Sequence, residues 1–98
     1  MTITWSRQAQ DDLAAIRDFI APDSERYAQL TIDRLVGATD RLLAWPRSGR
    51  VVPEVSDENL RELLIGLYRV VYRLQDNSIG IVTVTHSSRE FHVPEGAA

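Results

Sequence analysis

The chain has 98 residues, of which 44% are apolar and 26% charged, and its formal net charge is −3. This length suits one domain with a single core, so we expect one domain over residues 1–98, with a loosely held tail from about residue 90. The absence of cysteine excludes disulfide bonds and thiolate metal sites. No apolar run approaches the roughly 18–20 residues that cross a bilayer, and the first residues lack the pattern of a signal peptide. A cytoplasmic protein without a membrane partner is therefore expected.

The first half of the chain predicts a short strand followed by a helical hairpin. Residues 2–5 alternate as in a strand, and Ser6 can cap a helix over residues 8–20. Pro22 ends that helix, and Asp23 or Ser24 caps a second one over residues 25–43. The apolar stripes are Ala9, Leu13, Ile16 and Ile20 in the first helix, and Ala28, Ile32, Leu35, Thr39 and Leu42 in the second. A connection of about four residues predicts antiparallel helices.

The second half predicts a sheet. Extended segments are expected over residues 50–55, where Pro53 favours an edge position, and over residues 60–65, 68–75 and 79–85. Helices followed by strands indicate an α+β domain, with the N-terminal strand and antiparallel helical hairpin packed on one face of a small, mainly antiparallel β-sheet. By alternation Arg69 and Arg73 share a face, and we expect it to be the partly open one.

All 11 basic residues are arginine. Compositional bias of the source genome explains this, and so does selection for bidentate recognition of carboxylate or phosphate; the two readings are compatible. The strand arginines Arg50, Arg61, Arg69 and Arg89 also allow two interpretations. Each can pair with a neighbouring carboxylate, or at least two can lie unpaired on one face and bind an anionic partner. The candidate carboxylates are Glu54, Glu58, Glu62 and Glu90.

Aromatic side chains and histidines are more ambiguous. His86 can act as a general acid or base, although a hydrogen bond within a turn is the simpler interpretation. Tyr68 and Tyr72 favour core packing with hydroxyls at the rim, and Trp5 and Trp45 favour packing around the helices. Neither histidine has neighbours at metal-ligand spacing, so no metal and no cofactor are expected.

Several motifs together resemble one family. They are Trp5-Ser6 with Asp12-Leu13, then Pro46-Arg47-Ser48-Gly49-Arg50, Pro53-Glu54, Arg61-Glu62, Tyr68-Arg69-Val70-Val71-Tyr72-Arg73 and His86-Ser87-Ser88-Arg89. In this order and at these spacings, the chain from about residue 2 to residue 91 is similar to the RelE/ParE superfamily of type II toxins, and to its ParE-like branch in particular.

The resemblance implies a toxin held inactive by a cognate ParD-like antitoxin, as in plasmid stabilisation systems. ParE-like members poison DNA gyrase and block replication without catalysis of their own. RelE-like members are ribosome-dependent endoribonucleases that cut messenger RNA. Neither reading requires direct specific DNA binding by the toxin alone.

Departures from the RelE pattern favour the gyrase reading. Arg69 and Arg89 match two RelE active-site arginines, but Leu60 and Glu62 stand where lysines are expected, and no tyrosine follows Tyr72. A carboxylate in that place would repel a scissile phosphate.

The resulting expectations for sites are these. No residue is expected to be catalytic, and if the chain is an endoribonuclease the candidates are Arg69, Arg89 and His86. The target-binding candidates are Arg50, Arg61, Arg69, Arg73 and Arg89. The antitoxin-binding candidates are Phe19, Leu30 and Val36 on the helical hairpin.

Overall fold

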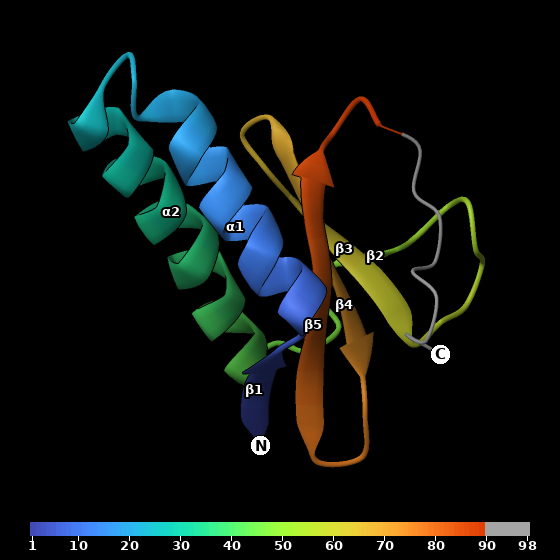
Figure 1. Ribbon diagram of the computed structural model, residues 1–98. Helices are drawn as coiled ribbons and strands as arrows, with labels where there is room; N and C mark the ends of the chain where they lie inside the picture. Colours follow the sequence, from blue (N-terminus) through green and yellow to red (C-terminus); the bar gives the residue numbers. More distant parts are fainter. Residues whose placement is uncertain (90–98) are drawn as a thin grey trace.

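A computed structural model describes residues 1–89 (Figure 1), so the predicted loose tail from residue 90 lies outside the described residues. The helices are α1 (Arg7–Ile20), α2 (Glu25–Asp40) and a short 3₁₀ helix, η1 (Arg41–Leu43). The strands are β1 (Thr2–Trp5), β2 (Arg50–Val51), β3 (Leu60–Ile65), β4 (Tyr68–Leu74) and β5 (Ser78–His86). Every predicted element is present, but the segment over residues 50–55 is a strand at its first two residues alone.

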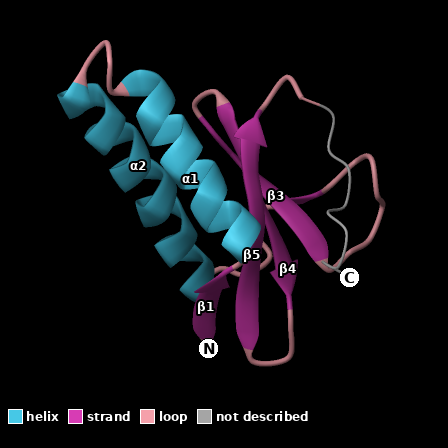
Figure 2. Cartoon of the chain, viewed as in Figure 1, coloured by secondary structure: helices cyan, strands magenta, loops and turns pink. Residues whose placement is uncertain are grey.

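The described strands form one sheet in the order β1-β5-β4-β3-β2, and α1 and α2 lie as an antiparallel hairpin against one of its faces (Figure 2). β1 runs parallel to β5, and the other pairs are antiparallel. This arrangement confirms the predicted α+β class and the helical hairpin on a mainly antiparallel sheet.

Two polar residues of the N-terminal segment fix α1 to β5. The Ser6 hydroxyl caps α1 by accepting a hydrogen bond from the Ala9 N–H at 3.0 Å, and it donates to the Val82 carbonyl at 2.7 Å. Asp12 accepts hydrogen bonds from the Val84 N–H at 2.9 Å and from the Thr83 hydroxyl. Because β1 pairs with β5 only as far as Ile81, these side chains satisfy backbone groups at the edge that β1 leaves open.

The larger core lies between the helices and the sheet. Its buried residues are Ala9, Leu35, Leu42, Val70, Tyr72, Ile79, Ile81 and Val84, and Trp5, Leu13 and Ile16 pack against it. The predicted stripes of both helices therefore face the sheet. Trp45, in contrast, is 67% exposed, so its predicted packing role is wrong.

The opposite face of the sheet has a core of its own. Val52 and Val55, from the segment that follows β2, pack on this face together with the strand residues Leu60, Val71 and Val82. Alternation placed Arg69 on this face correctly, but the prediction that the face is open is wrong there, because Arg69 is only 4% exposed. Pro53 lacks the N–H needed to extend β2, and the Ser56 N–H instead closes a turn onto the Val52 carbonyl at 3.0 Å.

Tyr72 fixes the turn that precedes β2. Its hydroxyl, expected at the rim, is buried: it accepts a hydrogen bond from the Gly49 N–H at 2.9 Å and donates to the Pro46 carbonyl at 2.8 Å. A Cβ at Gly49 would lie 2.6 Å from the Glu62 carbonyl oxygen, so only glycine fits this approach. The turn holds β2 against the first residues of β3, and within residues 1–89 no strand pairs with residues 63–65 on that side.

Candidate functional site

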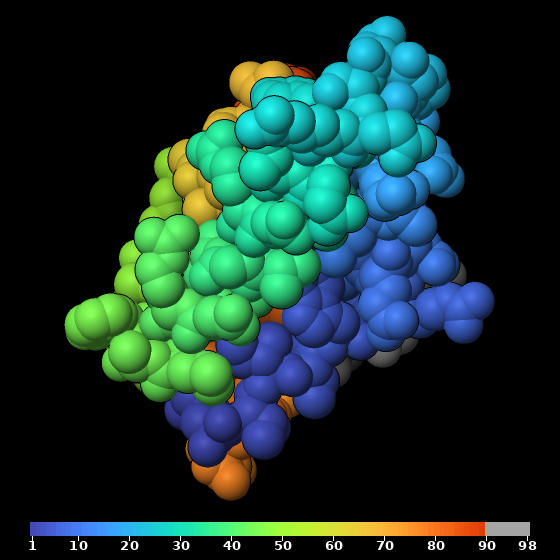
Figure 3. Space-filling view, turned by 90° about the vertical axis from the view of Figure 1, so that its left-hand side faces the viewer, coloured from blue at the N-terminus to red at the C-terminus, as the bar shows by residue number. Residues whose placement is uncertain are grey.

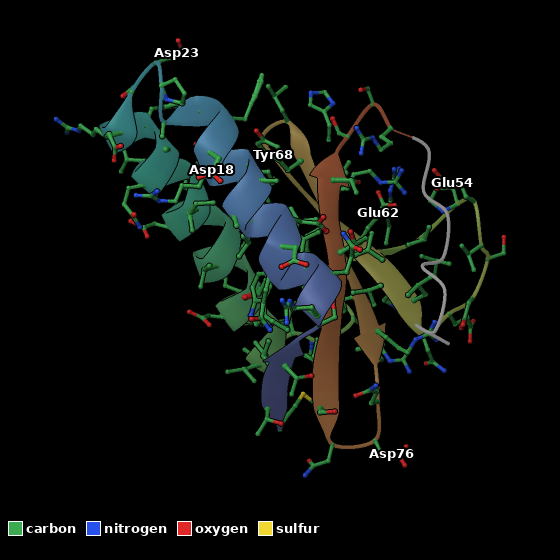
Figure 4. The ribbon with its side chains drawn as sticks, viewed as in Figure 1. Asp18, Asp23, Glu54, Glu62, Tyr68 and Asp76 are labelled. Atoms are coloured by element: carbon green, nitrogen blue, oxygen red, sulfur yellow. The ribbon has the colours of Figure 1, made fainter. Side chains whose placement is uncertain are left out.

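The centre of the arginine-rich motif pattern is a buried ion network around Arg69. Its Nη1 and Nη2 atoms donate to the two oxygens of Glu54, each at 2.9 Å, and Nη2 also donates to Glu62 at 2.6 Å. Nη1 donates further to the Arg89 carbonyl at 3.0 Å. The labelled Glu54 and Glu62 side chains lie on the side of the sheet away from the helices (Figure 4). The guanidinium of Arg69, on β4, thus forms hydrogen bonds with β3, with the segment after β2 and with the chain after β5.

The charges of this network balance within the protein. The hydrogen bond with Glu54 raises the pKa of Arg69, burial opposes that shift, and Glu62 adds to it. The Glu62 side chain is fully buried, and its other oxygen accepts from Arg50 Nη2 at 3.0 Å. Two arginines and two glutamates therefore neutralise one another, so of the two interpretations that the sequence left open, pairing with a carboxylate holds for Arg50 and Arg69.

Arg73 and Arg61 also have partners. Arg73 pairs with Asp57 at 3.3 Å, and the pKa of Asp57 is lowered first by the Asn59 N–H and then by Arg73. Arg61 donates to the carbonyls of Glu58 at 2.9 Å and of Gly49 at 3.0 Å. Among the strand arginines, the exposed side chains are therefore those of Arg50, at 58%, and Arg89.

His86 lies at the end of β5 and faces a cavity rather than the ion network. Its Nδ1 atom accepts from the Ser88 N–H at 3.1 Å and lies 2.7 Å from the Ser88 hydroxyl, as expected for a histidine held in a turn. Its ring meets Tyr68 edge-on, with the ring centroids 6.1 Å apart. The cavity has a volume of about 490 Å³ and is lined on its other side by Phe19 and Tyr27 of the helical hairpin.

The three residues proposed for ribonuclease chemistry do not form one site. Arg69 points to the face that carries Glu54 and Glu62, whereas His86 and Tyr68 line the cavity on the helical side. The sheet lies between these two groups. Arg89 is exposed, and its contact with Arg69 is made by its backbone carbonyl.

The antitoxin-binding candidates are exposed as the sequence predicts. Phe19 is 73% exposed, Leu30 49% and Val36 37%. Figure 3 shows the side of the molecule that α2 covers with its green and cyan atoms. Sequence reasoning missed further exposed apolar residues, among them Tyr27 and Leu64. Tyr27 lies off the buried stripe of its helix, and that was the available signal. Leu64 alternates in phase with the buried Leu60, so the local pattern gave no signal for its exposure.

Residues 1–89 contain neither a membrane-spanning helix nor a candidate metal site. No helix in that range combines the length and the apolar character that a membrane span requires. Within the same range no three histidine or acidic side chains are grouped so that they could hold a metal ion.

Comparisons with known proteins agree with this architecture. Residues 3–91 match the family model described as the ParE toxin of the type II toxin-antitoxin system parDE. The chain is 35% identical over 88 residues to a protein named Toxin RelE2 from Caulobacter vibrioides, which covers 89% of this chain and 96% of that protein. It belongs to the ParE toxin family, within the RelE/ParE superfamily.

Two solved structures share the fold. A chain of the chromosomal ParDE toxin-antitoxin system from P. aeruginosa superposes with a TM-score of 0.73 at 21% identity, covering 88% of this chain and 95% of that one. A chain of the RelBE2 toxin-antitoxin complex from Mycobacterium tuberculosis gives a TM-score of 0.57 at 20% identity, covering 87% and 95%. This protein is thus a toxin of a type II toxin-antitoxin system by family.

Proposed function

We propose that this toxin acts in the cytoplasm by binding DNA gyrase and blocking replication, without a catalytic residue of its own. The observation that carries the proposal is the neutralised state of Arg69. An endoribonuclease needs free cations beside the scissile phosphate. Here Glu54 and Glu62 take up both ends of this guanidinium, and His86 lies across the sheet from it.

The same network suggests a different use for the arginines. Arg69 holds the Glu54 segment and the Arg89 backbone in place, and Arg50 and Arg73 share its face of the sheet by register, with Arg89 exposed beyond β5. Arg61, which is paired with Tyr72, points to the opposite face. A protein surface rich in carboxylates suits such an array, since guanidinium groups pair with carboxylates in a bidentate manner. We therefore assign target contact to Arg50, Arg73 and Arg89 and a positioning role to Arg69, and Arg61 drops out of this array because it lies on the other face of the sheet.

The proposal includes neutralisation by a ParD-like antitoxin bound to the helical hairpin. Phe19, Leu30 and Val36 supply exposed apolar surface, and the 490 Å³ cavity beside Phe19 offers a place for an apolar anchor. Solved relatives of the same fold are described as toxin-antitoxin systems or complexes, which supports a partner of this kind.

A second candidate function is messenger RNA cleavage at the ribosome. It is favoured by one observation, the 35% identity to a relative named Toxin RelE2. In that case His86 and Arg89, both exposed near the end of β5, would supply the chemistry, and Arg69 would have to leave its glutamate partners.

Induction of the toxin in cells separates the two functions by the order of their effects. The gyrase reading predicts that thymidine incorporation stops first, that cells filament, and that messages remain intact. It also predicts that His86→Ala keeps toxicity, whereas Arg89→Glu reduces it more than Arg26→Glu, a matched change of an exposed arginine on α2. Protein synthesis that stops before DNA synthesis, with loss of toxicity in His86→Ala, would instead support the ribosome.

A further inference from the structure

Trp45 has no role in the account above, although its side chain is 67% exposed. It lines a cavity of about 560 Å³ that lies between the turn after η1 and the end of β4. The other apolar residues of the lining are Met1, Ala44, Pro46 and Leu74. We call this cavity, together with the two arginines beside Trp45, Arg47 and Arg61, the Trp45 site. Its rigidity, its charge and its apolar lining point to one kind of ligand.

The turn that carries Trp45 is held in place by side chains from the sheet. The Tyr72 hydroxyl donates to the Pro46 carbonyl at 2.8 Å, and Arg61 Nη1 donates to the Arg47 carbonyl at 3.3 Å. An exposed indole on a fixed backbone loses little conformational freedom when a ligand binds. Trp45 is therefore suited to be an anchor for a ligand, since its position is set before the ligand arrives.

The two arginines beside Trp45 keep charges that no carboxylate balances. Arg47 lines the cavity, and the hydrogen bonds of Arg61 go to carbonyl oxygens, which carry no net charge. Within residues 1–89 neither guanidinium has a carboxylate at ion-pair distance. Burial raises the pKa of Tyr72, and the charges of both arginines oppose that shift, so both lie near its hydroxyl. In a chain with a net charge of −3, this local excess of positive charge favours an anionic ligand.

The apolar lining and the charges together fit a nucleotide better than an acidic peptide. A nucleotide joins a planar base, which stacks on an aromatic ring, to a phosphate, which pairs with guanidinium groups. Aspartate and glutamate supply the anion without the planar face. Gln75 lines the same cavity, and its side-chain oxygen accepts from the Ser78 hydroxyl at 2.6 Å. The side-chain NH₂ group of Gln75 can therefore donate to a carbonyl of the base.

We propose that the Trp45 site binds single-stranded DNA, with an unpaired base stacked on Trp45 and the adjoining phosphates on Arg47 and Arg61, without reading the sequence. The choice of DNA rests on the proposed function, because a toxin bound to gyrase lies beside the DNA that gyrase cleaves. Bases inside an intact duplex are stacked on one another and offer no free face to Trp45. The site therefore requires a single strand or a frayed end.

The test uses hexathymidylate as the probe, with an abasic hexamer of the same phosphate backbone, a blunt duplex, hexauridylate and hexaglutamate as matched controls. Calorimetry at low salt measures affinity, and ¹⁵N spectra report the indole N–H groups of Trp45 and Trp5. Hexathymidylate should half-saturate the chain below about 1 mM, with a shift of the Trp45 indole signal and none at Trp5. The abasic hexamer, the duplex and hexaglutamate should bind at least about fivefold more weakly, because none supplies a free base. Hexauridylate should bind no more tightly than hexathymidylate.

Variants of the chain test the two halves of the site. Trp45→Ala should weaken hexathymidylate binding about tenfold, whereas Tyr27→Ala, which removes another exposed aromatic ring on α2, should leave it unchanged. Arg47→Gln should reduce the slope of log affinity against log salt concentration by about 0.7, the value for one phosphate contact on a single strand, and Arg26→Gln on α2 is its matched control. Because the comparison of oligonucleotides needs no variant, a variant that misfolds does not remove the test.

Four outcomes would overturn the inference. They are no binding of hexathymidylate up to about 1 mM, equal binding of the abasic hexamer, unchanged binding in Trp45→Ala, or equal binding of hexaglutamate, which would make an acidic protein segment the ligand. Hexauridylate that binds about tenfold more tightly than hexathymidylate would also overturn it, because RNA would then be the ligand. Gyrase inhibition is scored separately. A chain that inhibits gyrase but ignores hexathymidylate refutes this inference alone, and one that binds hexathymidylate without affecting gyrase refutes the proposed function alone.

Discussion

Replacing Arg69 tests whether its guanidinium is structural. Arg69→Met keeps the length of the side chain and removes the charge, leaving the fully buried Glu62 with Arg50 alone and Glu54 without its bidentate partner. Breaking a buried pair on one side costs about 3–5 kcal/mol, a large share of the roughly 5–15 kcal/mol that stabilises a domain. For a chain of this length, that loss corresponds to a decrease in melting temperature of roughly 12 °C or more.

Urea denaturation followed by circular dichroism measures this free energy of unfolding. The matched control is Arg73→Met, the same change on the same strand, whose pair with Asp57 at 3.3 Å is partly exposed and is expected to contribute about 1 kcal/mol or less. A double-mutant cycle with Glu62→Leu should give a coupling energy of about 1–3 kcal/mol between Arg69 and Glu62. If Arg69→Met unfolds within about 0.5 kcal/mol of the parent chain, the network does not stabilise the fold and our reasoning about it is wrong.

Three other predictions concern single residues. Tyr72→Phe leaves the buried Gly49 N–H without a partner and should lower the free energy of unfolding by about 2–3 kcal/mol in urea titrations. Burial raises the pKa of Tyr72 above its ordinary value of 10.0, so above that pH the unfolded chain loses the hydroxyl proton before the folded chain does. The free energy of unfolding should therefore fall as the pH rises beyond about 10, and it should fall less in Tyr72→Phe. An equal fall in both proteins would contradict this. Asp12→Asn weakens the contacts to Thr83 and Val84 and should lower the free energy of unfolding by about 1–2 kcal/mol. Hydrogen exchange at the Val84 amide should become faster, and unchanged exchange there would refute the role given to Asp12.

Periodicity was sufficient to predict the elements and the layer order. The stripe from Ala9 to Ile20 and the alternation around Tyr72 each follow from local repeat, and the caps at Ser6 and Ser24 follow from side-chain chemistry. The parallel pairing of β1 with β5 does not follow from local pattern, because it joins residues more than 70 positions apart.

The face that carries Arg69 shows where pattern reasoning fails. Alternation fixes the side of the sheet but not what covers that side. The segment from Val52 to Val55 carries few regular hydrogen bonds, so nothing in its sequence showed that it would pack on Leu60 and Val71. That packing buries Arg69 beside Glu54 and converts a predicted surface contact into an internal ion network.

The exposure of the antitoxin-binding candidates on the helical hairpin was easier to predict from the sequence. Phe19 and Leu30 lie off the buried stripes of their helices, and the structure leaves both exposed. The point at which β2 stops was not predictable in the same way. It is decided by the contact between Gly49 and Tyr72 across the sheet.

The most direct test of the central claim is a supercoiling assay with purified toxin, DNA gyrase, relaxed plasmid and ATP, scored also for double-strand breaks trapped on the enzyme. We predict loss of supercoiling with accumulated cleaved plasmid at toxin concentrations near that of gyrase, unchanged in His86→Ala and reversed by the antitoxin. Normal supercoiling across a wide excess of folded toxin, together with cleavage of messenger RNA on translating ribosomes, would contradict the gyrase assignment.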